Sequence, residues 1–261
     1  GSSLVGSEMC IRDRFDIDTK RVLHTPITNV EELKFDLIRQ LEELDRDDDV
    51  IVVIDSIGNL ASKKELEDTF NEKSVADMSR AKSLKGLFRM TTPYLKMKNI
   101  PLLAVNHTYK EIGLFPKDVV GGGTGIYYSA DNIWIIGRRQ QKTGTEVTGY
   151  EFVINIEKSR YVKEKSKIPI SVSWEGGIEE FSGLLDVALA GGYVVKPSNG
   201  WYQVVNKESG EMIGSKLREK DTLTGEFWNP IFADTDFKDF VKNQYSIGLT
   251  SKVDMEEIVS E

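Results

Sequence analysis

The sequence has few of the residues that build disulfide frameworks and metal centres. It contains one cysteine, Cys10, and two histidines among 261 residues. A single cysteine excludes an internal disulfide and is typical of a reducing compartment. So few histidine and cysteine side chains also argue against a structural zinc site. Apolar runs of about 18 residues are missing as well, so we expect no membrane span.

Charge sets a further limit. Acidic residues outnumber basic ones by 42 to 34, which gives a formal net charge of -8. A uniformly basic nucleic-acid-binding protein is thereby excluded, although a local basic face is not. A hydrophobic content of 39% with 29% charged residues is ordinary for a soluble globular protein. The length allows one large or two modest domains.

The two ends of the chain differ from the rest. Residues 1–14, GSSLVGSEMCIRDR, have no clear periodicity. We interpret them as a non-native leader, because SLVGSEMCIRD resembles adapter read-through at the ends of environmental sequence reads; a genuine flexible N-terminus is the alternative. On the first interpretation, native sequence begins near Phe15, within a domain. Residues 246–261 end in DMEEIVSE, four acids without a base, and we expect a mobile acidic tail.

Strand and helix patterns alternate in the first half of the chain. Strands are predicted at 21–27, 50–55 and 100–107, and helices at 29–44 and about 75–98. Asn29 is the expected N-cap of the first helix, and Pro93 is expected to kink the last turns of the second. This alternation is typical of a parallel sheet with crossover helices.

The second half has a different texture. A glycine-rich loop is predicted at 108–125, followed by an antiparallel extension with strands near 129–138, 149–158 and 167–174. Residues 176–245 are predicted to form a small appended domain. Its expected elements are a helix at 178–192 ending in a glycine pair, two strands around SNG, and short helices near 214–221 and 234–243.

The strand VIVVID ends in an acidic residue, Asp55, followed by Ser56. The carboxyl end of a parallel strand is where such sheets place their chemistry, and a carboxylate there suits Mg²⁺ beside a nucleotide. A site of this kind needs a phosphate loop, Gly-x4-Gly-Lys-Ser/Thr. Gly144 and Gly149 have the spacing, but Tyr150 occupies the lysine position. Either Asp55 is not in a nucleotide site, or the loop belongs to sequence that precedes Phe15.

Five motifs, in order, resemble the RecA recombinase family. They are VIVVIDSIGNLASKKELED, ADMSRAKSLKGLFRM, LLAVNHTYKEIGLFPKDVVGGGTG, IEKSR and EEFSGLLDVALAGGYVVKPSNGWYQV. The last of them makes the chain look closest to the phage UvsX-type recombinases, and the resemblance covers roughly 15–245. It implies an α/β fold: a RecA-like P-loop NTPase core at 15–175, truncated at its N-terminus, and a small α+β C-terminal domain at 176–245. The phosphate loop and a catalytic glutamate would precede Phe15, so we expect no measurable hydrolysis of ATP by this chain alone.

The resemblance assigns nucleotide-binding roles to four residues near the strand ends. Asp55 would orient Mg²⁺ through water, with support from Ser56. His107 would sense the γ-phosphate, where RecA proper has glutamine, and Asn106 is a weaker candidate for the same place. The alternatives are an aspartate that caps the next turn and a histidine that is simply satisfied at a strand end.

Lys158 and Arg160 alternate on a predicted strand and therefore share one face. The resemblance assigns them to the nucleotide of the next subunit, where they would act like arginine fingers. Solvated edge-strand charges are the alternative.

A basic helix is the first predicted DNA-binding element. Residues 73–98 contain seven bases and one acid, a net charge of +6. Lys82, Lys85 and Arg89 lie on one helical face, while Leu84, Leu87 and Phe88 point to the core. Arg80 belongs to the same predicted DNA-binding set. A merely solvated basic face is the alternative.

The predicted loop 108–125 is the second DNA-binding element. It contains five glycines, and its apolar residues Ile112, Leu114 and Phe115 are unusual for a linker. The resemblance makes Ile112 a wedge that enters between bases, with Phe115 beside it, and makes the backbone amides of Gly121, Gly122 and Gly123 contacts for phosphates. A lid that packs on its own protein is the alternative.

The resemblance implies an ATP-dependent DNA recombinase that uses ATP and Mg²⁺. It would form a homo-oligomeric helical filament on single-stranded DNA and exchange strands with duplex DNA, in the cytoplasm of a bacterial host and encoded by a phage. Phage mediator and single-stranded-DNA-binding proteins are possible partners. Two alternatives stay open: a non-hydrolytic DNA-binding or filament-interacting fragment, and a hexameric helicase of the same core fold.

Overall fold

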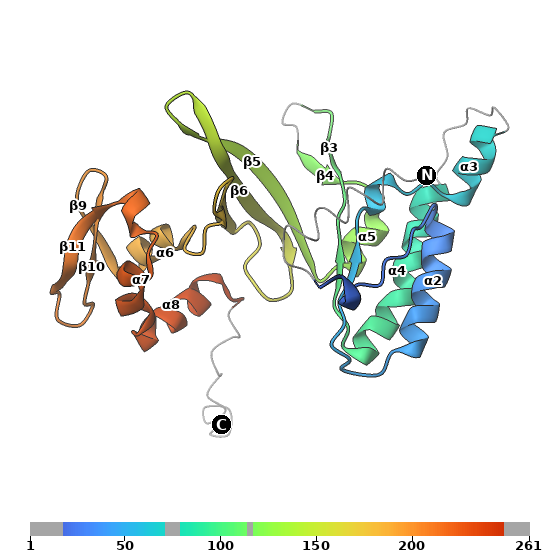
Figure 1. The fold of residues 1–261 in the computed structure, drawn as a ribbon. Helices are drawn as coiled ribbons and strands as arrows, with labels where there is room; N and C mark the ends of the chain where they lie inside the picture. The colour runs from blue at the N-terminus through green and yellow to red at the C-terminus, as the bar shows by residue number, and fades with distance from the viewer. Residues whose placement is uncertain (1–17, 71–78, 114–116, 248–261) are drawn as a thin grey trace, which may run out of the picture. The chain divides into compact units, whose positions relative to one another are not determined.

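The computed structural model describes residues 18–70, 79–113 and 117–247. The chain divides into two compact units, residues 1–129 and 130–261 (Figure 1). In the described part of the chain, no helix combines the length and apolarity needed to cross a membrane.

The first unit contains four α-helices and four short strands among its described residues. In order they are η1 (Thr19–Arg21), α2 (Val30–Glu43), β1 (Val52–Ile54), η2 (Ile57–Asn59), α3 (Lys63–Phe70), α4 (Ser79–Lys98), β2 (Leu102–Ala104), β3 (Thr108–Lys110), β4 (Asp118–Val120) and α5 (Thr124–Ser129). Asn29 caps α2, as predicted: its side chain accepts a hydrogen bond from the backbone N–H of Glu32 at 2.8 Å.

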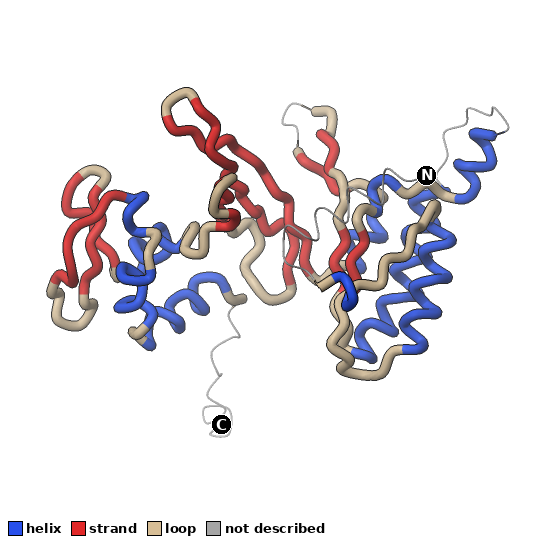
Figure 2. The backbone as a smooth tube through the Cα atoms, in the orientation of Figure 1, coloured by secondary structure: helices blue, strands red, loops and turns tan. Residues whose placement is uncertain are grey.

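The core of the first unit lies between two helices and one parallel strand pair. β1 and β2 pair in parallel, with Val52 opposite Leu102 and Ile54 opposite Ala104. Helices α2 and α4 run side by side against them (Figure 2). The predicted inner face of α4 is confirmed, because its Leu84, Leu87 and Phe88 are all buried. The same core includes apolar residues of α2 at helical spacing: Val30, Leu33, Leu37 and Leu41.

Several expectations for this unit are not met. Among the described strands, only β1 and β2 pair in parallel, and the other three sheets are antiparallel, so a RecA-like parallel core is not confirmed. The strand predicted at 21–27 is wrong: after η1 these residues are irregular and largely exposed, and Pro26 carries no N–H to donate to a ladder. The stretch 108–125, predicted as one loop, contains the antiparallel hairpin β3–β4 and the first two residues of α5.

The second unit begins with a four-stranded antiparallel sheet. Its strands, in spatial order, are β5 (Asn132–Thr143), β6 (Glu146–Ser159), β7 (Lys167–Ser173) and β8 (Gly177–Ile178). The predicted antiparallel extension is therefore confirmed, and its first two strands are longer than expected. The boundary expected at residue 176 stays a prediction.

A smaller sheet and three helices complete this unit. They are α6 (Leu184–Gly191), β9 (Val194–Ser198), β10 (Trp201–Val205), β11 (Met212–Arg218), η3 (Glu219–Thr222), α7 (Gly225–Phe232) and α8 (Thr235–Tyr245). The glycine stop of α6 is confirmed: Gly192 adopts a φ of 75° and its N–H bonds the carbonyls of Ala188 and Leu189. The small sheet and the three helices share one hydrophobic core, which includes Tyr193, Tyr202 and the fully buried Trp228.

The helix predicted at 214–221 is wrong. This stretch forms most of β11 and then η3, because β10 offers a pairing edge with Tyr202 opposite Leu217 and Val204 opposite Ile213. Leu217 thereby packs against the aromatic core. The helix predicted at 234–243 is confirmed as α8.

Candidate nucleotide and DNA sites

Asp55 and Ser56 follow β1 directly, at the edge where the parallel strand β2 also ends. The backbone joins the two ends, since Val105 N–H donates to Ile54 O at 2.9 Å and Ile57 N–H donates to Val105 O at 3.0 Å. The peptide bond between Asp55 and Ser56 is cis. Asp55 is exposed.

Oxygen donors at this edge fit Mg²⁺ held together with phosphate. The Ser56 hydroxyl is buried and has no hydrogen-bond partner among the described residues. Together with the Asp55 carboxylate it offers hard oxygen ligands, and Mg²⁺ usually takes one or two carboxylates, water and phosphate oxygens. Within the described ranges no group of three or more His, Cys, Asp or Glu residues could hold a metal ion. Nucleotide phosphates would therefore have to complete the coordination.

His107 contacts the segment that follows Asp55. Its Nε2 lies 3.1 Å from Asn59 Oδ1. The main chain of His107 is fixed from the other side, because Gly121 N–H donates to His107 O at 2.9 Å. Asn106 Nδ2 also donates to Gly121 O, at 2.8 Å, so the Asn106 amide has a structural use at this site. Residues 106 and 107 thus connect the edge where β1 and β2 end with the glycine run, residues 121–123.

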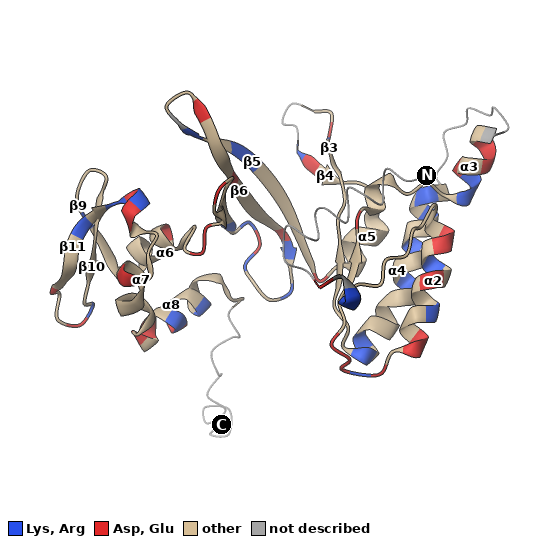
Figure 3. Ribbon diagram, viewed as in Figure 1, with Lys and Arg blue, Asp and Glu red and all other residues tan. Residues whose placement is uncertain are grey.

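The basic face of α4 is present as predicted. Lys82, Lys85 and Arg89 are exposed, and the ribbon of this helix carries blue Lys and Arg positions in Figure 3. Arg80 differs from them: its guanidinium donates to backbone carbonyls of residues 57, 58 and 60. The sequence analysis did not identify Gly58 and Asn59 as residues of the candidate site, although Gly58 O accepts from Arg80 and Asn59 contacts His107. Their position just after the Asp-Ser pair was the one sequence signal for them.

The glycine run packs directly on α4. A Cβ atom on Gly125 would lie 2.8 Å from Lys85 Cβ, and one on Gly122 would lie 3.0 Å from Leu84 Cδ1. Gly122 and Gly123 also have positive φ angles of 89° and 83°, which favour glycine. Of the predicted phosphate-binding glycines, Gly122 and Gly123 thus lie against Leu84 and Ala81 of α4, and Gly125, which is outside that set, lies against the basic residue Lys85.

The hairpin β3–β4 carries the predicted wedge. Its strands are joined by a 2.8 Å ion pair between Lys110 Nζ and Asp118 Oδ1. Ile112 lies beyond the last strand residue and is fully exposed, at 102% of its reference area. Leu114 and Phe115 lie outside the described residues. An aliphatic side chain in this position is available to a ligand without rearrangement.

Lys158 and Arg160 belong to the second unit, at the end of β6. Lys158 Nζ donates to Ala130 O at 2.8 Å, and Arg160 Nη1 lies 3.0 Å from Asp131 Oδ1. Both side chains thus reach the residues just before β5. Their contribution to the nucleotide of a neighbouring subunit stays a prediction.

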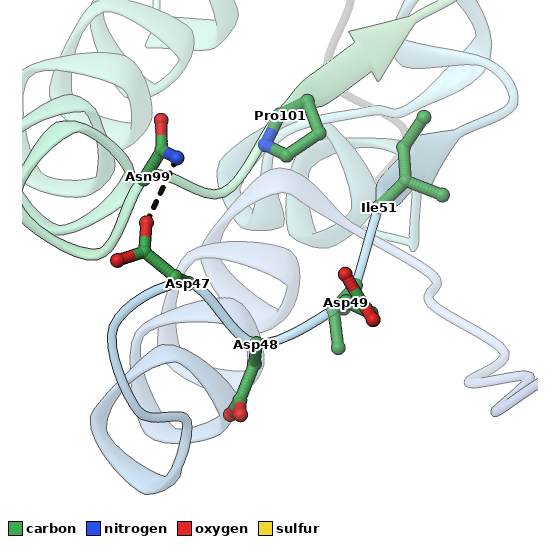
Figure 4. Close-up of a pocket in the computed structure, with 7 residues that line it drawn as sticks. Asp47, Asp48, Asp49, Ile51, Asn99 and Pro101 are labelled. Carbon is green, nitrogen blue, oxygen red and sulfur yellow. Dashed lines mark hydrogen bonds between the residues drawn. The ribbon is translucent and has the colours of Figure 1, made fainter.

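A hollow of about 520 Å³ lies at the opposite ends of β1 and β2 (Figure 4). Asp47, Asp48 and Asp49 line it, with Asn99 Nδ2 donating to Asp47 Oδ1 at 2.9 Å. Three carboxylates would repel a nucleotide phosphate, so this hollow does not compete with the Asp55 edge as a nucleotide site.

Known proteins similar to this chain are recombination proteins. Two RecA proteins are similar to this chain at low identity. RecA of Mycoplasma mycoides is 26% identical over 203 residues, which cover 75% of this chain and 56% of that RecA protein. RecA of Bdellovibrio bacteriovorus is 23% identical over 164 residues, which cover 62% of this chain and 43% of that RecA protein. The chain is thus related to the RecA proteins.

Within that class, the chain is similar to a phage protein. The recombination and repair protein of Enterobacteria phage T4 is 52% identical over 247 residues, which cover 93% of this chain and 62% of the T4 protein. The family model for the C-terminal domain of the T4 recombination and repair protein matches residues 181–241. The resemblance to RecA-family recombinases of the phage UvsX type is confirmed. The chain spans less than two thirds of the length of these relatives, and none of those named here is a helicase.

Proposed function

We propose that this chain is part of an ATP-dependent DNA recombinase that assembles as a filament on single-stranded DNA and exchanges strands with duplex DNA. The observation that carries the proposal is the 52% identity to the T4 recombination and repair protein across 93% of this chain. It is supported by the paired strands β1 and β2, which are followed by Asp55 and His107, and by the contact of His107 with Asn59 in the segment after Asp55.

On this proposal, the strand ends handle ATP. Mg²⁺, when bound, would neutralise charge on the phosphate oxygens. Asp55 would hold and orient the ion through water, with Ser56 beside it. His107 would donate a hydrogen bond to a phosphate oxygen. Lys158 and Arg160 would extend toward the nucleotide of a neighbouring copy, after release from Ala130 and Asp131.

The DNA would bind to α4, the glycine run and the hairpin. Lys82, Lys85 and Arg89 would neutralise phosphates, while the amides of the run Gly121, Gly122 and Gly123 would donate to phosphate oxygens. Ile112, with Phe115, would enter between bases. Because a phage protein is similar to this chain, we also propose that it acts in the cytoplasm of an infected bacterium, and we propose phage mediator and single-stranded-DNA-binding proteins as its partners.

The test compares two polypeptides in DNA-stimulated ATP hydrolysis and strand exchange. One is this chain, and the other is the chain extended by any open frame found upstream of the Phe15 codon in the source gene. If the extension contains Gly-x4-Gly-Lys-Ser/Thr, we expect the extended chain to hydrolyse ATP and exchange strands, and we expect this chain to bind DNA without hydrolysing ATP. Hydrolysis by this chain alone, or no DNA binding by either polypeptide, would contradict the proposal.

A further inference from the structure

Arg80 fixes the loop that follows the candidate metal ligands. Its guanidinium makes three hydrogen bonds to residues 57–60, here called the 57–60 loop. Nε donates to Leu60 O at 2.7 Å, and Nη2 donates to Ile57 O and Gly58 O, both at 2.9 Å. A planar fork can serve three carbonyls at fixed angles, whereas a lysine ammonium on a flexible stem cannot reproduce that geometry.

The same loop contacts the end of β2. Asn59 Oδ1 lies 3.1 Å from His107 Nε2. Gly58 is so near the imidazole that an added Cβ would lie 2.2 Å from His107 Cδ2. His107 O in turn accepts from Gly121 N–H at 2.9 Å. A continuous path therefore runs from Arg80 through the 57–60 loop and His107 to the start of the glycine run.

The first turns of α4 are themselves held firmly. Ser79 Oγ lies 2.6 Å from Ser62 Oγ, and Ser83 Oγ donates to Glu31 Oε1 at 2.5 Å. Glu31 Oε2 also accepts from Lys63 N–H at 2.8 Å. Helices α2, α3 and α4 are thereby joined at the point from which Arg80 extends. Because these contacts hold the N-terminal turns of α4 in place, the 57–60 loop cannot shift without breaking the Arg80 hydrogen bonds or moving α4.

We propose that Arg80 is a positioning residue that couples the nucleotide-facing edge to the DNA-facing surface, and not a contact for DNA phosphate. Arg80 is half-buried and three of the five guanidinium N–H donors bond backbone carbonyls, while Lys82 and Lys85 on the same helix are exposed. A change at Asp55 or His107 would reach the basic face of α4 through Arg80, and the glycine run through Gly121. The inference rests on the proposed function in naming what the two ends bind.

Histidine ring NMR on the free chain tests the positioning role without DNA. The chain has two histidines, so His24 serves as an internal reference. Arg80→Lys keeps the charge but not the fork, and Arg80→Met removes both. We expect both variants to shift the His107 ring signals, and the matched control Lys82→Met to leave them unchanged. Ring signals of His107 that are identical in the wild type and both Arg80 variants would overturn the inference.

Single-stranded-DNA binding at several salt concentrations separates positioning from phosphate contact. Each phosphate contact contributes about -0.7 to the slope of log K against log salt. We expect both Arg80 variants to bind about 3- to 30-fold more weakly with the wild-type slope, the range for residues that couple sites. Lys85→Met should make the slope shallower by about 0.7.

The two proposals fail in different ways. If Arg80→Lys binds like the wild type and Arg80→Met loses about 0.7 of slope, Arg80 is a phosphate contact and the inference is wrong. If the wild-type chain does not bind DNA, the proposed function is wrong, and the His107 ring signals still decide whether Arg80 positions the loop.

Discussion

At the scale of single residues, Gly58 and Gly86 have opposite surroundings. A Cβ at Gly58 would lie 2.2 Å from His107 Cδ2, whereas one at Gly86, inside α4, would meet nothing within 4 Å. We expect Gly58→Ala to lower the free energy of unfolding by about 1–3 kcal/mol, because the ring must move or the loop must shift. Urea denaturation followed by circular dichroism measures this.

Gly86→Ala is the matched control for that change. Alanine replaces glycine in a helix interior with open space around it, so we expect a gain of about 0.5–1 kcal/mol in the free energy of unfolding. If Gly58→Ala were neutral and left the His107 ring signals in place, the close approach between the 57–60 loop and β2 would be refuted.

Sequence located the candidate site residues but not what their side chains do. Asp55 and His107 were found from strand ends, which an apolar run followed by polar residues predicts well. The uses of Asn106 and Arg80 were not found, since their partners Gly121 and Leu60 lie 15 and 20 residues away. Helical periodicity says which face of α4 carries Arg80, and only the tertiary structure brings carbonyls within its reach.

At the scale of elements, Glu31 joins three helices and predicts a pH dependence. Burial raises the pKa of the Glu31 carboxyl, but hydrogen bonds from Ser83 Oγ and Lys63 N–H outweigh it, and the net shift is downward from the ordinary value of 4.5. A lowered folded-state pKa stabilises the fold above the unfolded-state pKa, and this stabilisation is lost as the pH falls through the folded-state value. Glu31→Gln should therefore cost about 1 kcal/mol at pH 7.

The loss of unfolding free energy caused by Glu31→Gln should become smaller as the pH falls below 4.5, because the wild-type carboxyl then becomes neutral, as the glutamine amide is at every pH. Urea denaturation at pH 7 and at lower pH measures the two differences. Glu43→Gln, an exposed carboxylate at the end of the same helix, is the control for general charge effects. A difference between wild type and Glu31→Gln that does not change with pH would contradict the assignment.

The hairpin β3–β4 gives a prediction about binding rather than stability. Ile112 is fully exposed, so Ile112→Ser should leave the free energy of unfolding within about 0.5 kcal/mol of the wild type. If the side chain enters between bases, affinity for single-stranded DNA should fall about 5- to 100-fold, with an unchanged salt slope because no charge is lost. Fluorescence anisotropy with a labelled oligonucleotide measures both quantities.

Leu23→Ser is the control for the hairpin. Leu23 is another large aliphatic residue, 79% exposed, and lies outside the candidate DNA surface. Equal losses of affinity in the two variants would show that Ile112 acts only through general surface hydrophobicity.

Elements with a strong period were predicted well, and elements that depend on distant partners were not. The inner face of α4 follows from the spacing of Leu84, Leu87 and Phe88, and it is confirmed. β11 was predicted as helix because its local sequence does not reveal β10 as a pairing partner. Similarly, β3 and β4 are three residues each, too short to show an alternating pattern.

At the scale of the whole molecule, the described residues form two hydrophobic clusters, one in each unit. One cluster joins α2, α4, β1 and β2, and the other joins α6, α7, α8 and the small sheet. The first consists of aliphatic residues with Phe88, whereas the second is built largely on aromatic rings. Since no residue belongs to both clusters, damage to one core should stay within its own unit.

Trp228 offers the sharpest test of that separation. It is fully buried, with Phe181 and Phe232 stacked at 6.1 and 5.8 Å between ring centroids. Trp228→Ala should lower the free energy of unfolding of the second unit by about 3–5 kcal/mol. Hydrogen exchange should then show lost amide protection in α6, α7 and α8, and unchanged protection in α2 and α4.

Two further variants sharpen this expectation. The Trp228 Nε1–H is buried without a hydrogen-bond partner among the described residues, so Trp228→Phe loses ring volume but no hydrogen bond, and should cost much less than Trp228→Ala. Trp174→Ala removes a ring that is 62% exposed in the same unit, and should change stability by no more than about 0.5 kcal/mol. If Trp228→Ala removed amide protection from α2 and α4 to the same extent, the two cores would unfold as one cooperative unit, and the separation would be wrong.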